Sequence, residues 1–537
     1  MAKLGQNLLE NPIIRGFNPD PSICRAGDRY FIATSTFEWY PGVQFFSSSN
    51  LRDWTFVGRP LAERRLLDLT GVPDSCGVWA PCLTFADNLF WLCYTNVRRF
   101  SGDFKDTPNF LTTSLSIDGP WSDPIYLNSS GFDPSLFHDS DGRKWLVNMV
   151  WDHRPDRSHF GGIVMQEYSV DQEVLIGPRR MIFPGSAHDG TEGPHLFAHD
   201  GYYFLICAEG GTGYQHAITV ARAKQIEGPY VLPERTHLIT AKDDPDHPLQ
   251  RSGHGDIVKT PDGRFFTTYL CSRPLPGGRS PMGRESGIQE IFYRDGWFHP
   301  DSGYDDVRPS ITPFCDPAAS VPVEVRYEFD GPALPHDFQW LRLPDTSELF
   351  STTAAKGRLR LYGRESVGST FNQALVARRQ TEHRYCAETT MEFAPDCFQQ
   401  AAGLITYYNA HKFHYCYVSF DPEFGRYAGI MSCAADLTTA VSFPDWKSKI
   451  PVYDGKIRIR VEVDGAKQQF FIASGPSAFE AVGPTLDSSL LSDEAGAGEG
   501  VNFTGNFVGM AVQDLTGQRR PADFLDFYYA TQAAGKP

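Results

Sequence analysis

Three acidic residues that lie far apart in the chain, Asp20, Asp133 and Glu192, each stand at the start of a similar segment. The segments read NPDPSICRAGDRYFIATST, GFDPSLFHDSDGRKWLVNMVW and TEGPHLFAHDGYYFLICAEG. Carboxyl groups that share one pocket can serve as a general acid and a general base, and this division of roles cleaves glycosidic bonds. The fold must therefore bring the starts of these three segments to one place.

These segments are copies of a unit that recurs five times. In each copy an apolar run is followed by a turn dipeptide and then by an aromatic-rich run, a pattern typical of a β-hairpin. Two more divergent copies are found at 77–96 and 252–272. The equivalent starts lie 60, 53, 59 and 62 residues apart, at Asp20, Ala80, Asp133, Glu192 and His254. This period is too long for a solenoid and fits the four-stranded blade of a β-propeller.

The repeat predicts an all-β protein whose first domain, residues 1–318, is a five-bladed β-propeller. Every innermost strand of a propeller begins near the central axis, so the three acidic residues would meet around one small cavity. After the fifth unit, a Pro-rich stretch at 308–335 is typical of a linker, with the boundary near 315–330. The remaining residues, 319–537, contain alternating strand-like runs without the hairpin unit. They predict a C-terminal β-sandwich of the jelly-roll or concanavalin-like type.

Length, charge and apolar runs narrow the class of protein. The 537 residues are enough for at least two domains with full cores. The chain has no apolar run long enough for a transmembrane helix, and the start MAKLGQNLLENPI lacks the features of a secretory signal. The net charge of −16 disfavours nucleic acid or an anionic membrane as a partner, whereas a neutral sugar fits. We therefore expect a cytoplasmic protein with no nucleic-acid and no membrane partner.

A series of motifs spreads over nearly the whole chain in a consistent order. They are NPDPS, STFEWYPGVQFFSSSNLRDW, GVWAP, GFDPSLF, NMVWDHRP, GTEGPHLF and GRESGIQ. Together they resemble glycoside hydrolase family 43, and more narrowly its two-domain β-xylosidase branch. The resemblance implies a five-bladed propeller, a C-terminal sandwich that helps to close the active site, and hydrolysis with inversion at the anomeric carbon.

The resemblance also implies roles for the three carboxyl groups. Asp20 in NPDPS matches the general base, Glu192 in TEGPH the general acid, and Asp133 in GFDPS the carboxylate that orients the acid and tunes its pKa. Inversion needs the base and the acid to stand roughly 6.5–9.5 Å apart, so that a water molecule fits between the base and the sugar. We expect burial and the charge of Asp133 to raise the pKa of Glu192, because a general acid must be protonated near neutral pH.

Glu192 departs from its own repeat by one position. Pro194, and not the residue after Glu192, aligns with Pro21 and Pro134 of the other units. The simpler explanation for Asp20 and Asp133 is a turn residue before proline, but a departure at the axis favours chemistry over blade packing at Glu192.

Four further residues match the sugar-binding pocket of the family. Phe37 in STFEW and Trp79 in GVWAP match aromatic residues that line the sugar subsites, while His254 in SGHGD and Arg284 in GRESG match polar groups. Trp39 stands close to Phe37 and is either a third stacking residue or ordinary core. For His254 the alternative is a structural histidine, and for Arg284 an ion pair with Glu285.

Two segments bear on the walls of this pocket. VNFTGNFVGM at 501–510 resembles the loop that the branch sends to the mouth of the active site, so Phe503 and Phe507 are alternatives for a capping contact, against ordinary strand packing. The second unit reads WAPC where the family commonly reads WAPD or WAPH, and we expect Cys82 to alter only the shape of the wall beside Trp79.

The function predicted from these features is an exo-acting, inverting β-xylosidase that releases xylose from the non-reducing end of 1,4-β-xylo-oligosaccharides. An α-L-arabinofuranosidase or a dual enzyme stays an alternative, because the two sugars place similar hydroxyls around the reacting carbon. A retaining β-fructosidase would carry an RDP motif that this chain lacks, and a non-catalytic carbohydrate-binding protein would usually have lost one carboxylate.

No cofactor is expected, and the chain shows no His/Asp cluster with the spacing of metal ligands. A structural or activating calcium ion near the propeller axis, as in some relatives of the family, stays an alternative. The branch often forms dimers or tetramers, so the resemblance implies a homo-oligomer.

Overall fold

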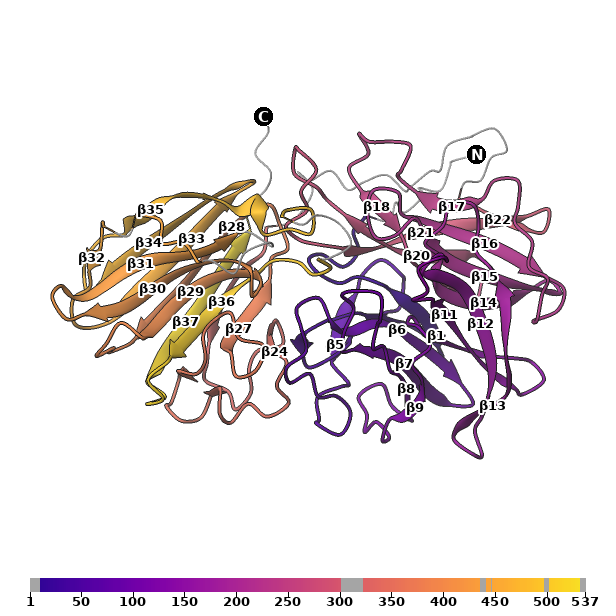
Figure 1. The fold of residues 1–537 in the computed structure, drawn as a ribbon, viewed down its shortest axis with the longest axis horizontal. Helices are drawn as coiled ribbons and strands as arrows, with labels where there is room; N and C mark the ends of the chain where they lie inside the picture. The colour runs from indigo at the N-terminus through magenta and orange to yellow at the C-terminus, as the bar shows by residue number, and fades with distance from the viewer. Residues whose placement is uncertain (1–9, 301–321, 435–440, 446, 497–501, 532–537) are drawn as a thin grey trace.

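The computed structural model describes residues 10–300, 322–434, 441–445, 447–496 and 502–531. The described chain is built almost entirely of strands, and the helix described in it is the short 3-10 turn η2 (Ser488–Leu490). Figure 1 shows two lobes side by side, the N-terminal lobe in indigo to magenta and the C-terminal lobe in orange to yellow. The prediction of an all-β protein is confirmed.

The N-terminal lobe consists of five antiparallel sheets, which are the five blades of a propeller. The first blade contains β1 (Ser22–Ala26), β2 (Arg29–Thr34), β4 (Gln44–Ser48) and β5 (Thr55–Gly58). The second contains β6 (Gly77–Ala86), β7 (Leu89–Val97), β8 (Asn109–Ser114) and β9 (Ile125–Asn128). The third contains β10 (Ser135–His138), β11 (Lys144–Trp151), β12 (Phe160–Ser169) and β13 (Val174–Phe183).

The last two blades complete the ring. The fourth contains β14 (Glu192–His199), β15 (Tyr202–Glu209), β16 (Ala217–Ala223) and β17 (His237–Thr240). The fifth contains β18 (Gln250–Gly253), β20 (Phe265–Ser272), β21 (Glu285–Arg294) and β22 (Trp297–His299), and β19 (Ile257–Lys259) also pairs with β20.

The turn dipeptides seen in the sequence join the two innermost strands of the blades. Asp87 and Asn88 both have positive φ angles, 55° and 58°, and so do Asp200 and Gly201, at 49° and 70°. Two consecutive left-handed residues make the tight turn whose twist matches that of the flanking strands. The hairpin unit of the sequence is therefore the inner half of each blade.

The N-terminal segment closes the ring by pairing with the last blade. Ile14 forms a bridge with Ser286, and the Asn11 side chain exchanges two hydrogen bonds of 2.9 Å with the backbone of Ile288. Because these contacts fix the first blade next to the fifth, the starts of all inner strands converge on one axis.

The C-terminal lobe is a sandwich of two eight-stranded antiparallel sheets. One sheet contains β23 (Glu324–Glu328), β25 (Phe350–Ser351), β26 (Leu359–Tyr362), β28 (Arg384–Glu392), β33 (Ile457–Asp464), β34 (Lys467–Ser474), β35 (Glu480–Asp487) and β37 (Pro521–Thr531). The other contains β3 (Trp39–Tyr40), β24 (Phe338–Leu341), β27 (Ala374–Arg379), β29 (Gln400–Asn409), β30 (Lys412–Asp421), β31 (Gly425–Ala434), β32 (Ile450–Pro451) and β36 (Phe507–Asp514). Alternating side chains of both sheets form the core between them.

The two lobes share a sheet and an apolar contact. Strand β3 belongs to the propeller segment, yet it pairs with β24 of the sandwich. Trp39 of β3 stacks on Phe507 with ring centroids 3.6 Å apart, so Trp39 is core and not a sugar-stacking residue. The predicted limit between residues 318 and 319 lies in 301–321, outside the described residues, and stays a prediction.

Candidate active site

A cavity of about 300 Å³ lies where the inner strands of the propeller begin. Eight of the nine residues predicted from the sequence line it: Asp20, Phe37, Trp79, Asp133, Glu192, His254, Arg284 and Phe503. Seven of them come from the propeller, and Phe503 comes from the sandwich. The propeller and the sandwich together therefore bring side chains that lie far apart in the sequence, from Asp20 to Phe503, into one cavity.

Each blade has a residue in the left-handed region of backbone conformation at or near its innermost strand. The φ angles are 58°, 36°, 56°, 56° and 44°, at Asp20, Ala80, Asp133, Gly193 and His254. Non-glycine residues in this region are strained, and such strain is concentrated at functional sites. In the fourth blade the left-handed position belongs to Gly193, so Glu192 lies one residue earlier, as the proline alignment indicates.

The close approach of His254 explains why glycine occupies this position. A Cβ atom on Gly193 would lie 2.8 Å from His254 Nε2, which is closer than real Cβ contacts come. An acidic side chain at the left-handed position of the fourth blade would thus collide with the imidazole. Glu192 reaches the cavity from the preceding position instead.

Asp20 is held by donors on several sides. Ser35 Oγ donates to Asp20 Oδ2 at 2.6 Å, and Arg284 Nη1 donates to Asp20 Oδ1 at 3.3 Å. His254 Nδ1 lies 3.7 Å from Asp20 Oδ1, but burial lowers the pKa of His254 to about 4. The imidazole is therefore neutral at neutral pH, and Arg284 is the cation beside Asp20. Arg284 thus contacts an acidic partner, but it is Asp20 of the site and not Glu285.

Glu192 and Asp133 are a buried pair with raised pKa values. Burial and then the charge of Asp20 raise the pKa of Glu192 to about 8. Burial, the charge of Glu192 and the charge of Asp20 raise the pKa of Asp133 well above its usual range. The charge that raises the pKa of Glu192 is therefore that of Asp20, and not that of Asp133 as the sequence suggested.

Asp133 also fixes the backbone next to the predicted acid. The amide of Gly193 donates to Asp133 Oδ2 at 2.9 Å. This hydrogen bond connects the start of the third blade to the peptide that follows Glu192, so Asp133 orients Glu192 through the main chain. This contact is consistent with the role predicted for Asp133, which is to position Glu192 without taking part in the reaction.

Three aromatic rings form one wall of the cavity. The ring centroids of Phe37 and Trp79 are 5.7 Å apart, and Phe503 lies 6.5 Å from Phe37 and 5.6 Å from Trp79. The backbone of Phe503 is tied to the propeller at both ends, because its amide donates to Ser75 Oγ at 3.1 Å and its carbonyl accepts from Arg284 Nη2 at 2.7 Å. The sandwich thus places one ring in the propeller's cavity.

Phe507 does not line the cavity, and its prediction as a substrate contact is corrected. The side chain is fully buried, and its ring lies against Trp39 and Arg379 at the contact between the lobes. Phe507 opens strand β36, whose alternation turns this ring toward the propeller core, whereas Phe503 precedes the strand and is free to enter the cavity. Of the two alternatives, Phe503 is the residue at the cavity.

Cys82 does not shape the wall beside Trp79, so that expectation is also corrected. Its side chain is buried, does not line the cavity, and approaches His195 Nδ1 at 3.9 Å. The chain bulges between Trp79 and Cys82, where the register with the next strand shifts, and this separates the two side chains.

Several residues of the cavity were not identified from the sequence. They are Lys105, Phe132, Trp151, Phe160, Gly211 and Thr212. Lys105 lies with its Nζ 4.1 Å from the centroid of the Trp151 ring. Trp151 ends the third copy of the repeat and stands in the motif NMVWDHRP, which could have marked it. Lys105 lies in the connection between β7 and β8, where no repeat position could reveal it.

Within the described ranges, no group of three or more His, Cys, Asp and Glu side chains could hold a metal ion. A calcium ion near the propeller axis stays an alternative, because calcium also takes backbone carbonyl and water ligands. That the reaction needs no cofactor stays a prediction.

Comparisons with known proteins agree with this geometry. Residues 9–298 match the model of glycosyl hydrolases family 43, and residues 326–530 match the β-xylosidase C-terminal concanavalin A-like domain. The chain is 48% identical to the xylosidase/arabinosidase 43B of Humicola insolens, over 97% of each chain. It is 44% identical to the β-xylosidase of Bacillus subtilis, over 97% of this chain and 99% of the relative.

A solved structure shares the whole architecture. The crystal structure of xylan β-1,4-xylosidase from Bacillus halodurans C-125 superposes with a TM-score of 0.91 at 42% identity. The match covers 98% of this chain and all of that one. With both lobes matched and the carboxyl groups gathered at the axis, this chain belongs to glycoside hydrolase family 43.

Proposed function

We propose that the chain is an exo-acting, inverting β-xylosidase that removes xylose from the non-reducing end of 1,4-β-xylo-oligosaccharides. One observation carries the proposal: a cavity of about 300 Å³ is lined by the three carboxyl groups of Asp20, Asp133 and Glu192 and by an aromatic ring from the second lobe. This volume is at the lower end of the range for small-ligand sites, so the cavity admits a short end of a sugar chain.

The reaction follows from the protonation states. Glu192, whose pKa is raised to about 8, holds a proton at neutral pH and gives it to the glycosidic oxygen as the bond to the anomeric carbon breaks. A water molecule attacks that carbon from the opposite face, and Asp20 takes its proton. The products are xylose with inverted configuration and the shortened oligosaccharide. Exchange with solvent then returns the proton from Asp20 to Glu192.

The other residues position the sugar and the acid. Asp133 holds the Gly193 amide next to Glu192, and Arg284 fixes both Asp20 and the Phe503 carbonyl. The rings of Phe37, Trp79 and Phe503 offer apolar faces to the C–H groups of a pyranose.

A dual xylosidase and α-L-arabinofuranosidase is the second candidate. The Humicola insolens relative, named a xylosidase/arabinosidase, favours it at 48% identity. The measured release of each sugar decides between the two candidates.

Proton NMR of the purified chain acting on xylobiose tests the proposal. We expect α-xylose to appear before mutarotation, because a single displacement inverts the anomeric carbon. A parallel run with a 4-nitrophenyl arabinofuranoside measures the second activity. If β-xylose appears first, the roles of Asp20 and Glu192 are wrong, and if only arabinose is released, the proposed substrate is wrong.

The variant Glu192→Gln is the control that separates an enzyme from a binding protein. The amide keeps the size of the side chain but has no proton to give, so turnover of xylobiose should fall roughly 100- to 10,000-fold while binding persists. Unchanged turnover would contradict the role of Glu192.

The remaining predictions concern partners and location. In the residues that the structure describes, we find no helix whose length and apolar character would let it span a membrane. We propose that the chain forms a homo-oligomer, either a dimer or a tetramer. Size-exclusion chromatography with light scattering would measure its molar mass in solution. The absence of a nucleic-acid partner and the cytoplasmic location stay predictions from the sequence.

A further inference from the structure

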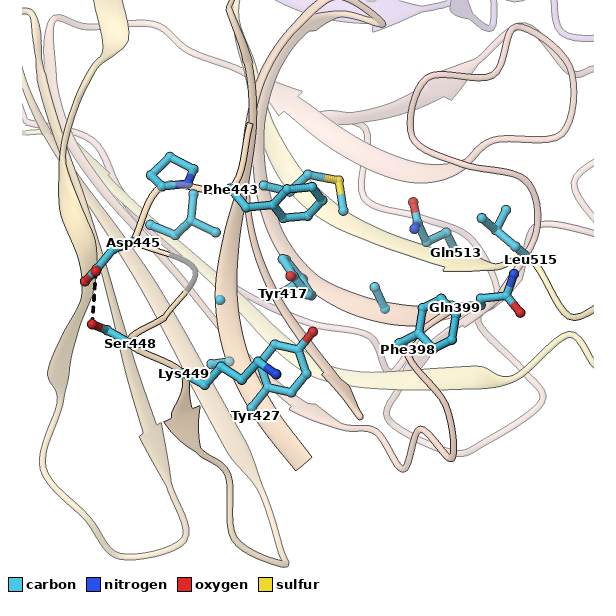
Figure 2. A pocket seen from close by; sticks show the side chains of 16 residues that line it. Phe398, Gln399, Tyr417, Tyr427, Phe443, Asp445, Ser448, Lys449, Gln513 and Leu515 are labelled. Atoms are coloured by element: carbon cyan, nitrogen blue, oxygen red, sulfur yellow. Dashed lines mark hydrogen bonds between the residues drawn. The ribbon is translucent and has the colours of Figure 1, made fainter. Parts of the chain in front are cut away.

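A second cavity lies on the sandwich and shares no residue with the active site. Its volume is about 630 Å³, roughly twice that of the catalytic cavity at about 300 Å³. Its floor is the face of β30 and β31 that is turned away from the other sheet (Figure 2). Its walls come from the chain before β29, the turn after β36, residues 443–445 and residues 448–449. We call it the sandwich cavity.

Aromatic rings dominate the sandwich cavity. Tyr417 and Tyr427 lie on the floor with ring centroids 6.1 Å apart, and the rings of Phe398 and Phe443 lie on either side of Tyr417 in Figure 2. Phe398 is 69% exposed and Phe443 is 45% exposed. Large apolar side chains left open at the rim of a concave surface mark a binding site.

A glycine on the floor makes room for the Tyr417 side chain. Gly429 pairs with Tyr417 across the two strands, and a Cβ atom there would lie 3.3 Å from the Tyr417 hydroxyl. The Tyr417 side chain therefore lies over residue 429 and is only 7% exposed. The rings open to a ligand are those of Phe398, Phe443 and the half-buried Tyr427.

The charged side chains of the cavity are already paired. Lys449 binds Asp421 and lies 4.9 Å from the centroid of the Tyr427 ring, while Asp445 accepts a hydrogen bond of 2.9 Å from Ser448. The other polar side chains of the lining are the neutral amides of Gln399 and Gln513. A lining of rings and amides, in which the charge of Lys449 is met by Asp421, favours a neutral ligand with apolar faces and many hydroxyl groups.

We infer that the sandwich cavity is a second carbohydrate-binding site, which holds a neutral xylo-oligosaccharide without cleaving it. The ring faces stack on the pyranose units and the amides bind their hydroxyls, as the aromatic wall and polar groups do in the catalytic cavity. Hydrolysis needs two carboxyl groups, and among the described residues of this lining the one acidic side chain is Asp445. The choice of xylose units rests on the proposed function.

The test uses the full chain with its catalytic acid replaced, Glu192→Gln, so that the ligand is bound but not consumed. Isothermal titration with xylohexaose should show two sites per chain. The further changes Phe398→Ala and Phe443→Ala should remove one site, or weaken it roughly tenfold, because each deletes an exposed stacking ring. Tyr453→Ala, which removes a ring that is 68% exposed on the same lobe but outside the cavity, is the matched control.

The outcomes are distinct. A single site in the Glu192→Gln chain, or two sites that survive the loss of Phe398 and Phe443, overturns the inference. If those two changes instead reduce the oligomeric state measured by light scattering, the cavity is covered by a second copy of the chain and the inference is also wrong. Hydrolysis of xylobiose by the unchanged chain reports on the proposed function alone, so the two failures are distinguishable.

Discussion

At the scale of single residues, the site depends on one displaced side chain. The left-handed position of the fourth blade is occupied by glycine because the His254 ring lies 2.8 Å from where a Cβ would be. Glu192 therefore enters from the neighbouring position, where burial and Asp20 raise its pKa to about 8. A carboxyl group at the regular position of the repeat, such as Asp20 or Asp133, has a different set of neighbours.

The charge of Lys105 should set the alkaline limit of activity. Lys105 lies on the cavity wall and, after Arg284, lowers the pKa of Glu192 against the stronger effects of burial and Asp20. A general acid works only while protonated, so kcat/KM for xylobiose should fall as the pH rises through about 8. In Lys105→Met the pKa of Glu192 rises further, and the fall should move to higher pH.

The pH profiles of kcat/KM for the two chains measure this shift. Lys224→Met is the matched control, because Lys224 lies outside the cavity and should leave the alkaline limb in place. If the alkaline limb of the pH profile does not move in Lys105→Met, a group other than Glu192 limits kcat/KM at high pH.

The carboxyl trio could be predicted from the sequence, whereas Lys105 could not. Asp20 and Asp133 occupy repeat positions that recur at a constant spacing, and Glu192 departs from that spacing by one residue. Lys105 stands in the connection between the second and third strands of its blade, and these connections differ in length and sequence from blade to blade. A sequence repeat reveals only the positions that all units share. A residue of a variable connection that contacts the cavity therefore cannot be identified from the repeat.

At the scale of elements, the inner hairpins were predictable and strand β3 was not. The hairpins carry both an apolar pattern and a turn dipeptide, while β3 (Trp39–Tyr40) has two residues and shows no period. Its pairing with β24 is a contact between the two lobes, so the local sequence does not indicate it. The same holds for Phe503 and Phe507, which look alike in VNFTGNFVGM until the start of β36 at Phe507 separates them.

Glu38, in the segment between β2 and β3, should make stability fall with rising pH. Its carboxyl is fully buried, and burial and the charge of Asp74 raise its pKa from 4.5 to about 8. Between these two values the unfolded chain releases the proton while the folded chain keeps it. The contribution is therefore present below about pH 4.5 and is lost as the pH rises to about 8.

Urea unfolding at pH 5 and pH 8 measures this contribution. The loss of unfolding free energy between the two values should be smaller in Glu38→Gln than in the unchanged chain, because the amide does not titrate. Glu234→Gln, at an exposed position, is the control and should show the full loss. An equal loss in Glu38→Gln and the unchanged chain would contradict the buried titration.

At the scale of the whole molecule, ion pairs of one buried arginine, Arg251, join the two lobes next to the active site. Arg251 of β18 is 1% exposed, and its guanidinium binds Asp493 at 2.8 Å and Glu494 at 3.1 Å on the sandwich. The same side chain donates to the carbonyl of Thr212 at 2.8 Å, and Thr212 lines the catalytic cavity. Docking of the sandwich is thus coupled to one wall of the site.

Removal of this guanidinium should destabilise the protein strongly. In Arg251→Met the buried carboxylate of Asp493 and the partly buried carboxylate of Glu494 lose their cation, which costs about 3–5 kcal/mol in unfolding free energy. Urea unfolding measures the loss, and kcat/KM for xylobiose should fall as the Thr212 wall loses its support. Arg180→Met breaks an exposed pair with Glu227 and should cost about 1 kcal/mol or less. Equal losses of unfolding free energy in Arg251→Met and Arg180→Met would contradict a stabilising role for the ion pairs of Arg251 between the lobes.

The strand pairing of β3 with β24 has a consequence for modularity. A propeller produced without the sandwich would expose the Trp39 face and leave the β3 edge without its partner, and unpaired edges of this kind recruit other chains. A sandwich produced alone would lose an edge strand as well as the ring against which Phe507 packs. The two folds are therefore not interchangeable parts, and exchange of the sandwich between relatives must carry the 39–40 segment with it.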